Sequence, residues 1–110
     1  MIGTWEGPVD QPGSVDYSIR VVISGANGAA RTVAEVFYPG LECGGTWRLV
    51  SATENAARVI ETITSDPEVT CIKSVPVELS LVGDQMSYTV FQGDDFRSVV
   101  ATATLNRRTN

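Results

Sequence analysis

The stretch "YSIRVVISGANGAARTVAEVFYPG", residues 17 to 40, decides the fold class of this chain. Apolar side chains at every second position share one face of its first part: Tyr17, Ile19, Val21 and Ile23. A period of two residues is typical of a strand with one buried face. The Gly- and Asn-rich segment that follows is typical of a turn. Residues 32 to 38 then resume the extended pattern, so the stretch predicts a β-hairpin.

The rest of the chain repeats this pattern. Extended segments are expected at residues 2 to 6, 46 to 51, 57 to 64, 75 to 82, 86 to 91 and 98 to 107. Within the last of these, Val99, Ala101, Ala103 and Leu105 are expected to share one face. Turn signals recur about every eight to twelve residues, as in all-β sandwiches and barrels. The chain therefore predicts eight short strands and an all-β fold.

One segment has a helical alternative. Ser51 and Glu54 have the spacing of a capping box. The apolar residues that follow also fit the helical template: Ala56, Val59, Ile60 and Ile63. The strand is favoured because residues 58 to 64 are rich in β-branched side chains and alternate.

Eight antiparallel strands joined by hairpins can form an open sandwich or an up-and-down barrel. Closure removes the two exposed sheet edges, which would otherwise pair with other chains. We therefore expect a closed eight-stranded antiparallel barrel, in which the last strand pairs with the first. Trp5 would then close the base of the barrel, with the guanidinium of Arg107 or Arg108 stacked on its ring.

The hairpin that contains residues 46 to 64 suggests one ionic pair. If its turn lies at Glu54 and Asn55, then Arg48 faces Glu61 across the two strands. On the surface such a pair contributes roughly 0 to 1 kcal/mol. If the pair faced inward, it could instead bind a polar ligand.

The two cysteines, Cys43 and Cys71, fall in loops between predicted strands. We expect them to form a disulfide, with two free thiols as the alternative. A disulfide indicates an oxidising, extracytoplasmic location. By length, residues 1 to 110 form one domain. We interpret Met1 as an initiator fused to a domain excised from a larger membrane-anchored or secreted protein, with a complete cytosolic protein as the alternative.

Composition excludes several function classes. The net charge of −5 and the scattered Lys and Arg residues argue against nucleic-acid binding. No apolar run approaches the roughly 18 residues of a spanning helix, so we expect no membrane insertion by this domain. The chain has no histidine. It therefore has no His-containing triad and no His-ligated metal, and we expect no catalysis, metal or cofactor. Asp94 and Asp95 are best explained by a solvated turn.

Several motifs resemble known families. The Gly3-Thr4-Trp5 start, the eight alternating segments and the terminal arginines resemble the lipocalin or calycin pattern. A resemblance over nearly the whole chain is to small β-rich domains of actinobacterial envelope proteins, including the extracytoplasmic C-terminal part of some membrane-anchored serine/threonine protein kinases. The residues that match this layout are Trp5, Gly7, Gln11, Tyr38, Pro39, Leu41, Cys43, Gly45, Glu61, Cys71 and Arg107.

This resemblance implies an extracytoplasmic sensor or ligand-binding module without catalytic residues. Its partner would be a small ligand, an envelope component or another protein. The alternative is a secreted inhibitor of a protease or lysozyme, whose basic cleft would suit the acidic loop at Asp94 and Asp95.

We expect the barrel interior to be mostly filled, so that a ligand binds at the open rim. The candidate ligand contacts there are Tyr38, Trp47 and Tyr88, together with Glu61 and Arg48. Ordinary core packing is the alternative for the three aromatic residues.

Overall fold

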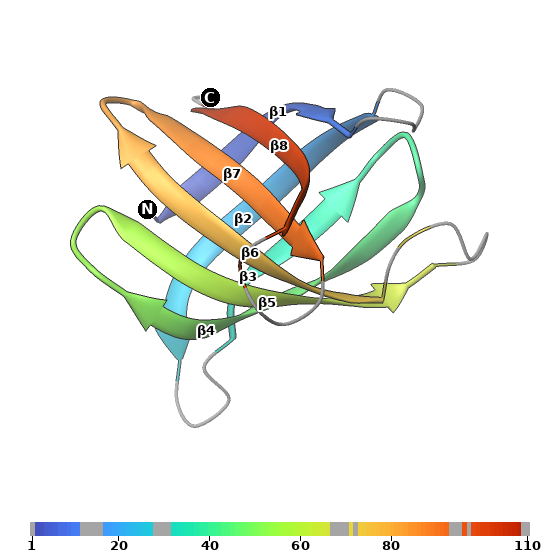
Figure 1. Cartoon of the computed structure of the whole chain (residues 1–110), viewed down its shortest axis with the longest axis horizontal. Coiled ribbons are helices and arrows are strands. Elements are labelled where there is room, and N and C mark those ends of the chain that lie inside the picture. Colours follow the sequence, from blue (N-terminus) through green and yellow to red (C-terminus); the bar gives the residue numbers. More distant parts are fainter. Residues whose placement is uncertain are drawn as a thin grey trace.

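The computed structural model of the chain is an all-β structure whose eight strands close into a barrel, β1 to β8 in sequence order (Figure 1). It describes residues 2–11, 17–27, 32–66, 71, 73–92, 96 and 98–108. The strands are β1 (Gly3–Asp10), β2 (Tyr17–Asn27), β3 (Thr32–Tyr38), β4 (Cys43–Ala52), β5 (Ala56–Ser65), β6 (Ser74–Val82), β7 (Gln85–Gln92) and β8 (Ser98–Arg107). All neighbouring strands are antiparallel, and the fold is compatible with a lipocalin-like barrel. The predicted fold class is therefore confirmed.

Alternation along the strands separates the inside of the barrel from the outside. In β2, Ile19 and Val21 are 0% exposed, while the intervening Arg20 and Val22 lie on the outer face. The same period of two places one apolar row of every strand in the interior. The core is therefore built from all eight strands.

Pairing of β1 with β8 closes the barrel. Trp5 lies opposite Arg107, and Val9 lies opposite Ala103. The first strand continues to Asp10, four residues beyond its predicted end at Glu6. Pro8 has no N–H, and the pairs with β8 skip Gly7 and Pro8, while pairing with β2 continues through both. A proline is tolerated here because it interrupts the ladder on one side only.

The segment with the helical alternative is strand β5, which pairs with β4 and β6. Near the turn the pairing is the one predicted, with Ala52 opposite Ala57. A register shift between Leu49 and Ser51 then moves the pairs formed by residues 45 to 49 by one residue, and a further shift between Gly44 and Gly45 restores the predicted register at Gly44. Such a shift is the signature of a β-bulge, in which one strand carries an extra residue.

The predicted pair of Arg48 and Glu61 is wrong for this reason. Trp47 lies opposite Glu61, and Arg48 lies opposite Ile60 on the exposed face. Another register shift, between Val90 and Phe91 in the pairing of β7 with β8, has a similar effect in β8. Val99 was expected to share a face with Ala101, but it is 57% exposed.

The barrel has two different ends. The Trp5 end contains the start of β1, the β4–β5 and β6–β7 turns and the end of β8; both turns and the N-terminus lie on the left in Figure 1. The disulfide end contains the β3–β4 turn and the segment between β5 and β6. Cys71 lies in that segment, whereas Cys43, which was expected in a loop, is the first residue of β4. None of the described residues forms a helix that is long and apolar enough to cross a membrane.

Candidate functional site

A cluster of hydrogen-bonded polar side chains crosses the interior of the barrel. Glu61 on β5 accepts a hydrogen bond from Trp47 Nε1 on β4 (2.8 Å) and another from the Tyr38 hydroxyl on β3 (2.7 Å), both at Oε1. The Tyr38 hydroxyl lies 2.7 Å from that of Tyr88 on β7. Because Tyr38 gives its only proton to Glu61, Tyr88 must be the donor in that second bond. These four side chains are called the Glu61 cluster below.

Burial determines the protonation behaviour of the cluster. Glu61 is 3% exposed, and desolvation raises its pKa above the ordinary value despite the opposing hydrogen bonds from Trp47 and Tyr38. Desolvation also raises the pKa values of Tyr38 and Tyr88 well above the usual range, and both phenols face the Glu61 carboxyl. Both tyrosines are therefore neutral donors.

The residues predicted to contact a ligand at the open rim lie instead in the barrel interior or, for Arg48, on its outer face. Tyr38, Trp47 and Tyr88 are 4%, 0% and 1% exposed, so their side chains fill the interior. The Trp47 and Tyr88 rings are stacked with centroids 6.1 Å apart. Arg48 lies on the exposed outer face. The structure thus brings three predicted aromatic residues and Glu61 together, and separates Arg48 from them.

The signal for this cluster was present in the sequence. Tyr38, Trp47, Glu61 and Tyr88 each occupy an inward position on a different strand. A buried acid needs donors, and buried Tyr and Trp need acceptors. The cluster was missed because the pairing of Arg48 with Glu61 appeared to supply the partner.

An apolar pocket of about 210 Å³ opens at the Trp5 end. Its apolar lining consists of Ile2, Ile23, Val33, Trp47, Leu49, Ala52, Ala56, Ala57, Val59 and Leu79. Two polar residues of the β4–β5 turn, Thr53 and Glu54, complete the lining. We call this cavity the end pocket. Trp47 belongs both to its wall and to the Glu61 cluster, so the two features share one side chain.

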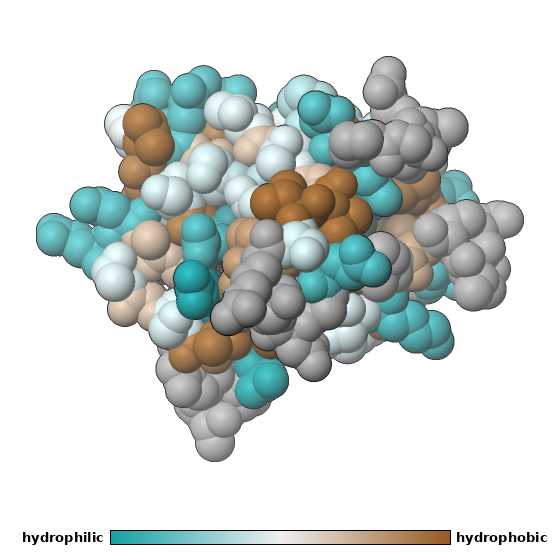
Figure 2. Space-filling model, in the orientation of Figure 1, coloured by the Kyte–Doolittle hydropathy of each residue, from teal (hydrophilic) through white to brown (hydrophobic). Residues whose placement is uncertain are grey.

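A larger depression of about 380 Å³ lies outside the barrel over β1 and β2. Its lining includes Glu6 and Arg20, which form an exposed ion pair with an N–O distance of 3.3 Å. Exposed apolar side chains elsewhere form separate patches among polar ones on the face shown in Figure 2. The end pocket is the cavity whose apolar lining continues into the core, so it is the better candidate for a ligand site.

Trp5 and Arg107 close the same end of the barrel beside this pocket. The Arg107 guanidinium carbon lies 4.5 Å from the centroid of the Trp5 ring, the arrangement that the sequence led us to expect. Arg107 Nη1 also donates a hydrogen bond to the Ile2 carbonyl (2.6 Å). Gly3 has a φ of 137°, and a Cβ on it would lie 2.5 Å from Arg107 Nη1. The positive φ therefore favours glycine two residues before the tryptophan, and any other residue there would also displace the end of the Arg107 side chain.

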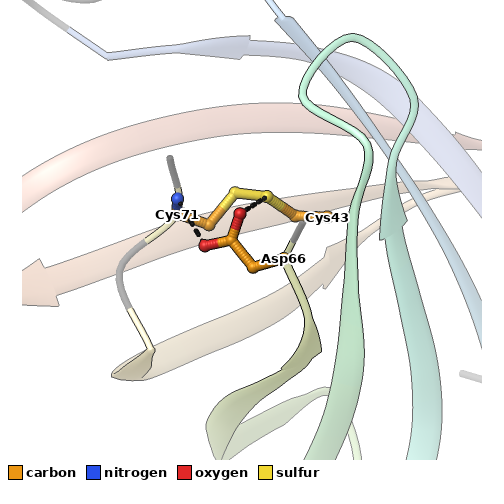
Figure 3. A group of neighbouring side chains, drawn as sticks. All are labelled: Cys43, Asp66 and Cys71. Atoms are coloured by element: carbon orange, nitrogen blue, oxygen red, sulfur yellow. Dashed lines mark hydrogen bonds between the residues drawn. A yellow bond between two sulfur atoms is a disulfide. The ribbon is translucent and has the colours of Figure 1, made fainter. Parts of the chain in front are cut away.

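At the opposite end of the barrel, the disulfide between Cys43 and Cys71 links the start of β4 to the segment between β5 and β6. Figure 3 shows the Asp66 carboxylate beside it. Asp66 Oδ2 accepts a hydrogen bond from the Cys71 N–H (3.0 Å), and its Oδ1 lies 3.4 Å from Cys43 Sγ. Although these three residues lie within reach of a common metal ion, their sulfurs are bonded to each other. The group therefore offers no thiolate ligand in this state.

The acidic loop at Asp94 and Asp95, on which the inhibitor alternative depends, lies outside the described residues. Comparison of the chain with models of protein families, with curated proteins and with solved structures gave no match. The candidate site therefore stands on its geometry alone.

Proposed function

We propose that this domain is an extracytoplasmic ligand-binding module, the sensor part of an actinobacterial envelope protein such as a membrane-anchored serine/threonine kinase. One observation carries the proposal: a closed barrel with a filled core retains an apolar pocket of about 210 Å³ at one end. Filled cores pack closely, so a pocket of this size is a candidate binding site.

The size of the pocket suits a small molecule. A cavity of roughly 150 Å³ is sufficient for benzene in an engineered protein core. The end pocket is larger and opens at the mouth of the barrel, so it suits an apolar body of about six to eight carbon atoms.

Binding without catalysis fits the chemistry of the residues. The acid and phenols of the Glu61 cluster are buried and hydrogen-bonded to one another. The chain has no histidine to act as a general base near neutral pH. The lining of the end pocket among the described residues includes one acid, Glu54, whereas glycoside hydrolysis by carboxyl groups uses two.

The disulfide supports the proposed location, because such bonds form and persist mainly in oxidising compartments. The kinase association rests on the resemblance of the sequence motifs. It is tested by the full-length gene product: a spanning helix and a kinase domain ahead of this domain would support it. A signal peptide directly before Ile2 would instead indicate a free-standing carrier or inhibitor.

Binding is tested by titrating the protein with hexanol as a neutral apolar probe and following the indole N–H signal of Trp47 by NMR. We expect that signal to shift with saturation. Ala52→Phe, which fills the mouth of the pocket, should weaken binding at least tenfold. Val50→Phe is the matched control, because Val50 lies in the same hairpin and is exposed like Ala52, but it does not line the pocket. An unchanged Trp47 signal, or equal binding by the two variants, would refute the proposal.

A further inference from the structure

The carboxylate at the rim of the end pocket has no charged partner among the described residues. Glu54 lines the pocket from the exposed β4–β5 turn. Within the part of the chain that the structure describes, its carboxylate forms no ion pair or side-chain hydrogen bond. The backbone of the turn is itself satisfied, since Thr53 N–H donates to the Ala56 carbonyl at 2.8 Å and Leu81 N–H donates to the Asn55 carbonyl at 2.7 Å. These two bonds fix the backbone of the turn that carries Glu54.

Two arginines of the described chain, Arg107 and Arg58, have partners other than Glu54. Arg107 stacks on Trp5 and donates to the Ile2 carbonyl. Arg58 donates to Glu78 at 2.9 Å and lies over the Phe96 ring, with its guanidinium carbon 4.6 Å from the centroid. Neither arginine belongs to the lining of the end pocket, and the described lining contains no basic residue.

The apolar lining and the Glu54 carboxylate together predict which head group is preferred among ligands that have the same apolar body. An apolar chain would bury itself against Leu49, Val59 and Leu79, and its head group would emerge at the rim beside Glu54 and Thr53. A carboxylate head would meet a like charge there, on a chain whose net charge is already −5. An ammonium head would meet an opposite charge, and a hydroxyl head would be neutral toward it.

We propose that the end pocket binds small amphiphiles with a short apolar body and a cationic ammonium head, and that Glu54 is the residue that sets this preference. The inference rests on the proposed ligand-binding function and specifies its ligand class. Thr53 can contribute a hydroxyl to the same head group.

Three probes with the same chain test this proposal: hexylammonium, hexanol and hexanoate, titrated at neutral pH and low salt with the Trp47 indole signal as readout. We expect hexylammonium to bind about tenfold more tightly than hexanoate, with hexanol between them. Raising the salt concentration to about 1 M should reduce this ratio, because the interaction lies at the surface.

Glu54→Gln should bring the three affinities to within about threefold of one another. The matched control is Glu35→Gln, which removes the same charge from an exposed position on β3 and should keep the preference for ammonium. Equal affinities in the unmodified protein, tighter binding of hexanoate, or a preference unchanged by Glu54→Gln would overturn this inference while leaving the pocket as a binding site. Failure of all three probes to bind would overturn the proposed function itself.

Discussion

Glu61 is a carboxyl group whose hydrogen-bond partners, Trp47 and Tyr38, are neutral donors. Burial raises its pKa, which means that folding favours the protonated form. The stability from this group is fully present below the unfolded-state pKa of about 4.3, and it is lost as the pH rises through the higher folded-state pKa. The domain therefore carries a carboxyl whose ionisation opposes folding.

Glu61→Gln should remove this pH dependence. The free energy of unfolding of the unmodified protein should fall relative to that of the variant as the pH rises above about 4, by about 1.4 kcal/mol for each unit by which folding raises the pKa. Urea unfolding at a series of pH values measures this difference. Glu35→Gln controls for the loss of one negative charge at an exposed site. A difference between the unmodified protein and Glu61→Gln that stays constant with pH would contradict the expectation.

Gly3 illustrates a second constraint at the level of one residue. Gly3→Ala should destabilise the domain by about 1 to 3 kcal/mol, because it combines a left-handed φ with a Cβ in the place of Arg107 Nη1. Gly83→Ala is the control, since Gly83 also has a positive φ, 65°, but a Cβ there would meet no atom within 4 Å. Urea unfolding should show the larger loss for Gly3→Ala. Equal losses would mean that backbone strain alone explains the glycine.

Among the elements, the start of β4 and the segment between β5 and β6 are joined by the disulfide. The disulfide stabilises the fold by lowering the conformational entropy of the unfolded chain. Cys43 and Cys71 are separated by 28 residues in sequence. In the chain-entropy model, a crosslink of this span stabilises the fold by about 3 to 4 kcal/mol. Urea unfolding with and without a phosphine reductant should show a loss of this size. A Cys43→Ser/Cys71→Ser variant should have the reduced stability and no response to the reductant.

The strands themselves were largely predictable, and their irregularities were not. Residues 32 to 38 and 98 to 107 match β3 and β8, because alternation bounded by turn residues is a strong signal. The register shift beyond Leu49 has no comparable signal, since one extra β-branched residue fits a strand on either face. That single residue decides whether Arg48 or Trp47 faces Glu61. The end pocket was not predicted either, because its shape depends on which side chains leave space at the mouth.

For the whole molecule, closure makes every strand equivalent in one respect, because each strand pairs with two neighbours. These are the strands directly before and after it in the chain, except that β1 and β8 also pair with each other. The pair β1 and β8 then differs from the others only in lacking a connecting turn. The start of β1 and the residue after β8 lie close together, since the Arg108 N–H donates a hydrogen bond to the Thr4 carbonyl at 2.8 Å.

A circular permutant should therefore fold. Its original termini would be joined by a short Gly-Ser linker, and its new termini would lie in the β6–β7 turn between Gly83 and Asp84, which are exposed. We expect the two indole N–H signals and the cooperative unfolding of the parent to be retained. A permutant that is expressed but lacks dispersed NMR signals would show that the order of strand synthesis matters.

The seam between the first and last strands has a consequence for biosynthesis. The bond from Arg107 to Ile2 joins residues 105 positions apart, so a nascent chain cannot form it until almost the entire domain has left the ribosome or the export channel. Until then β1 and β7 each present an open edge, on which other chains can template aggregation. Loss of the last ten residues to a protease would have the same effect, so a truncated domain should aggregate rather than persist as a seven-stranded remnant.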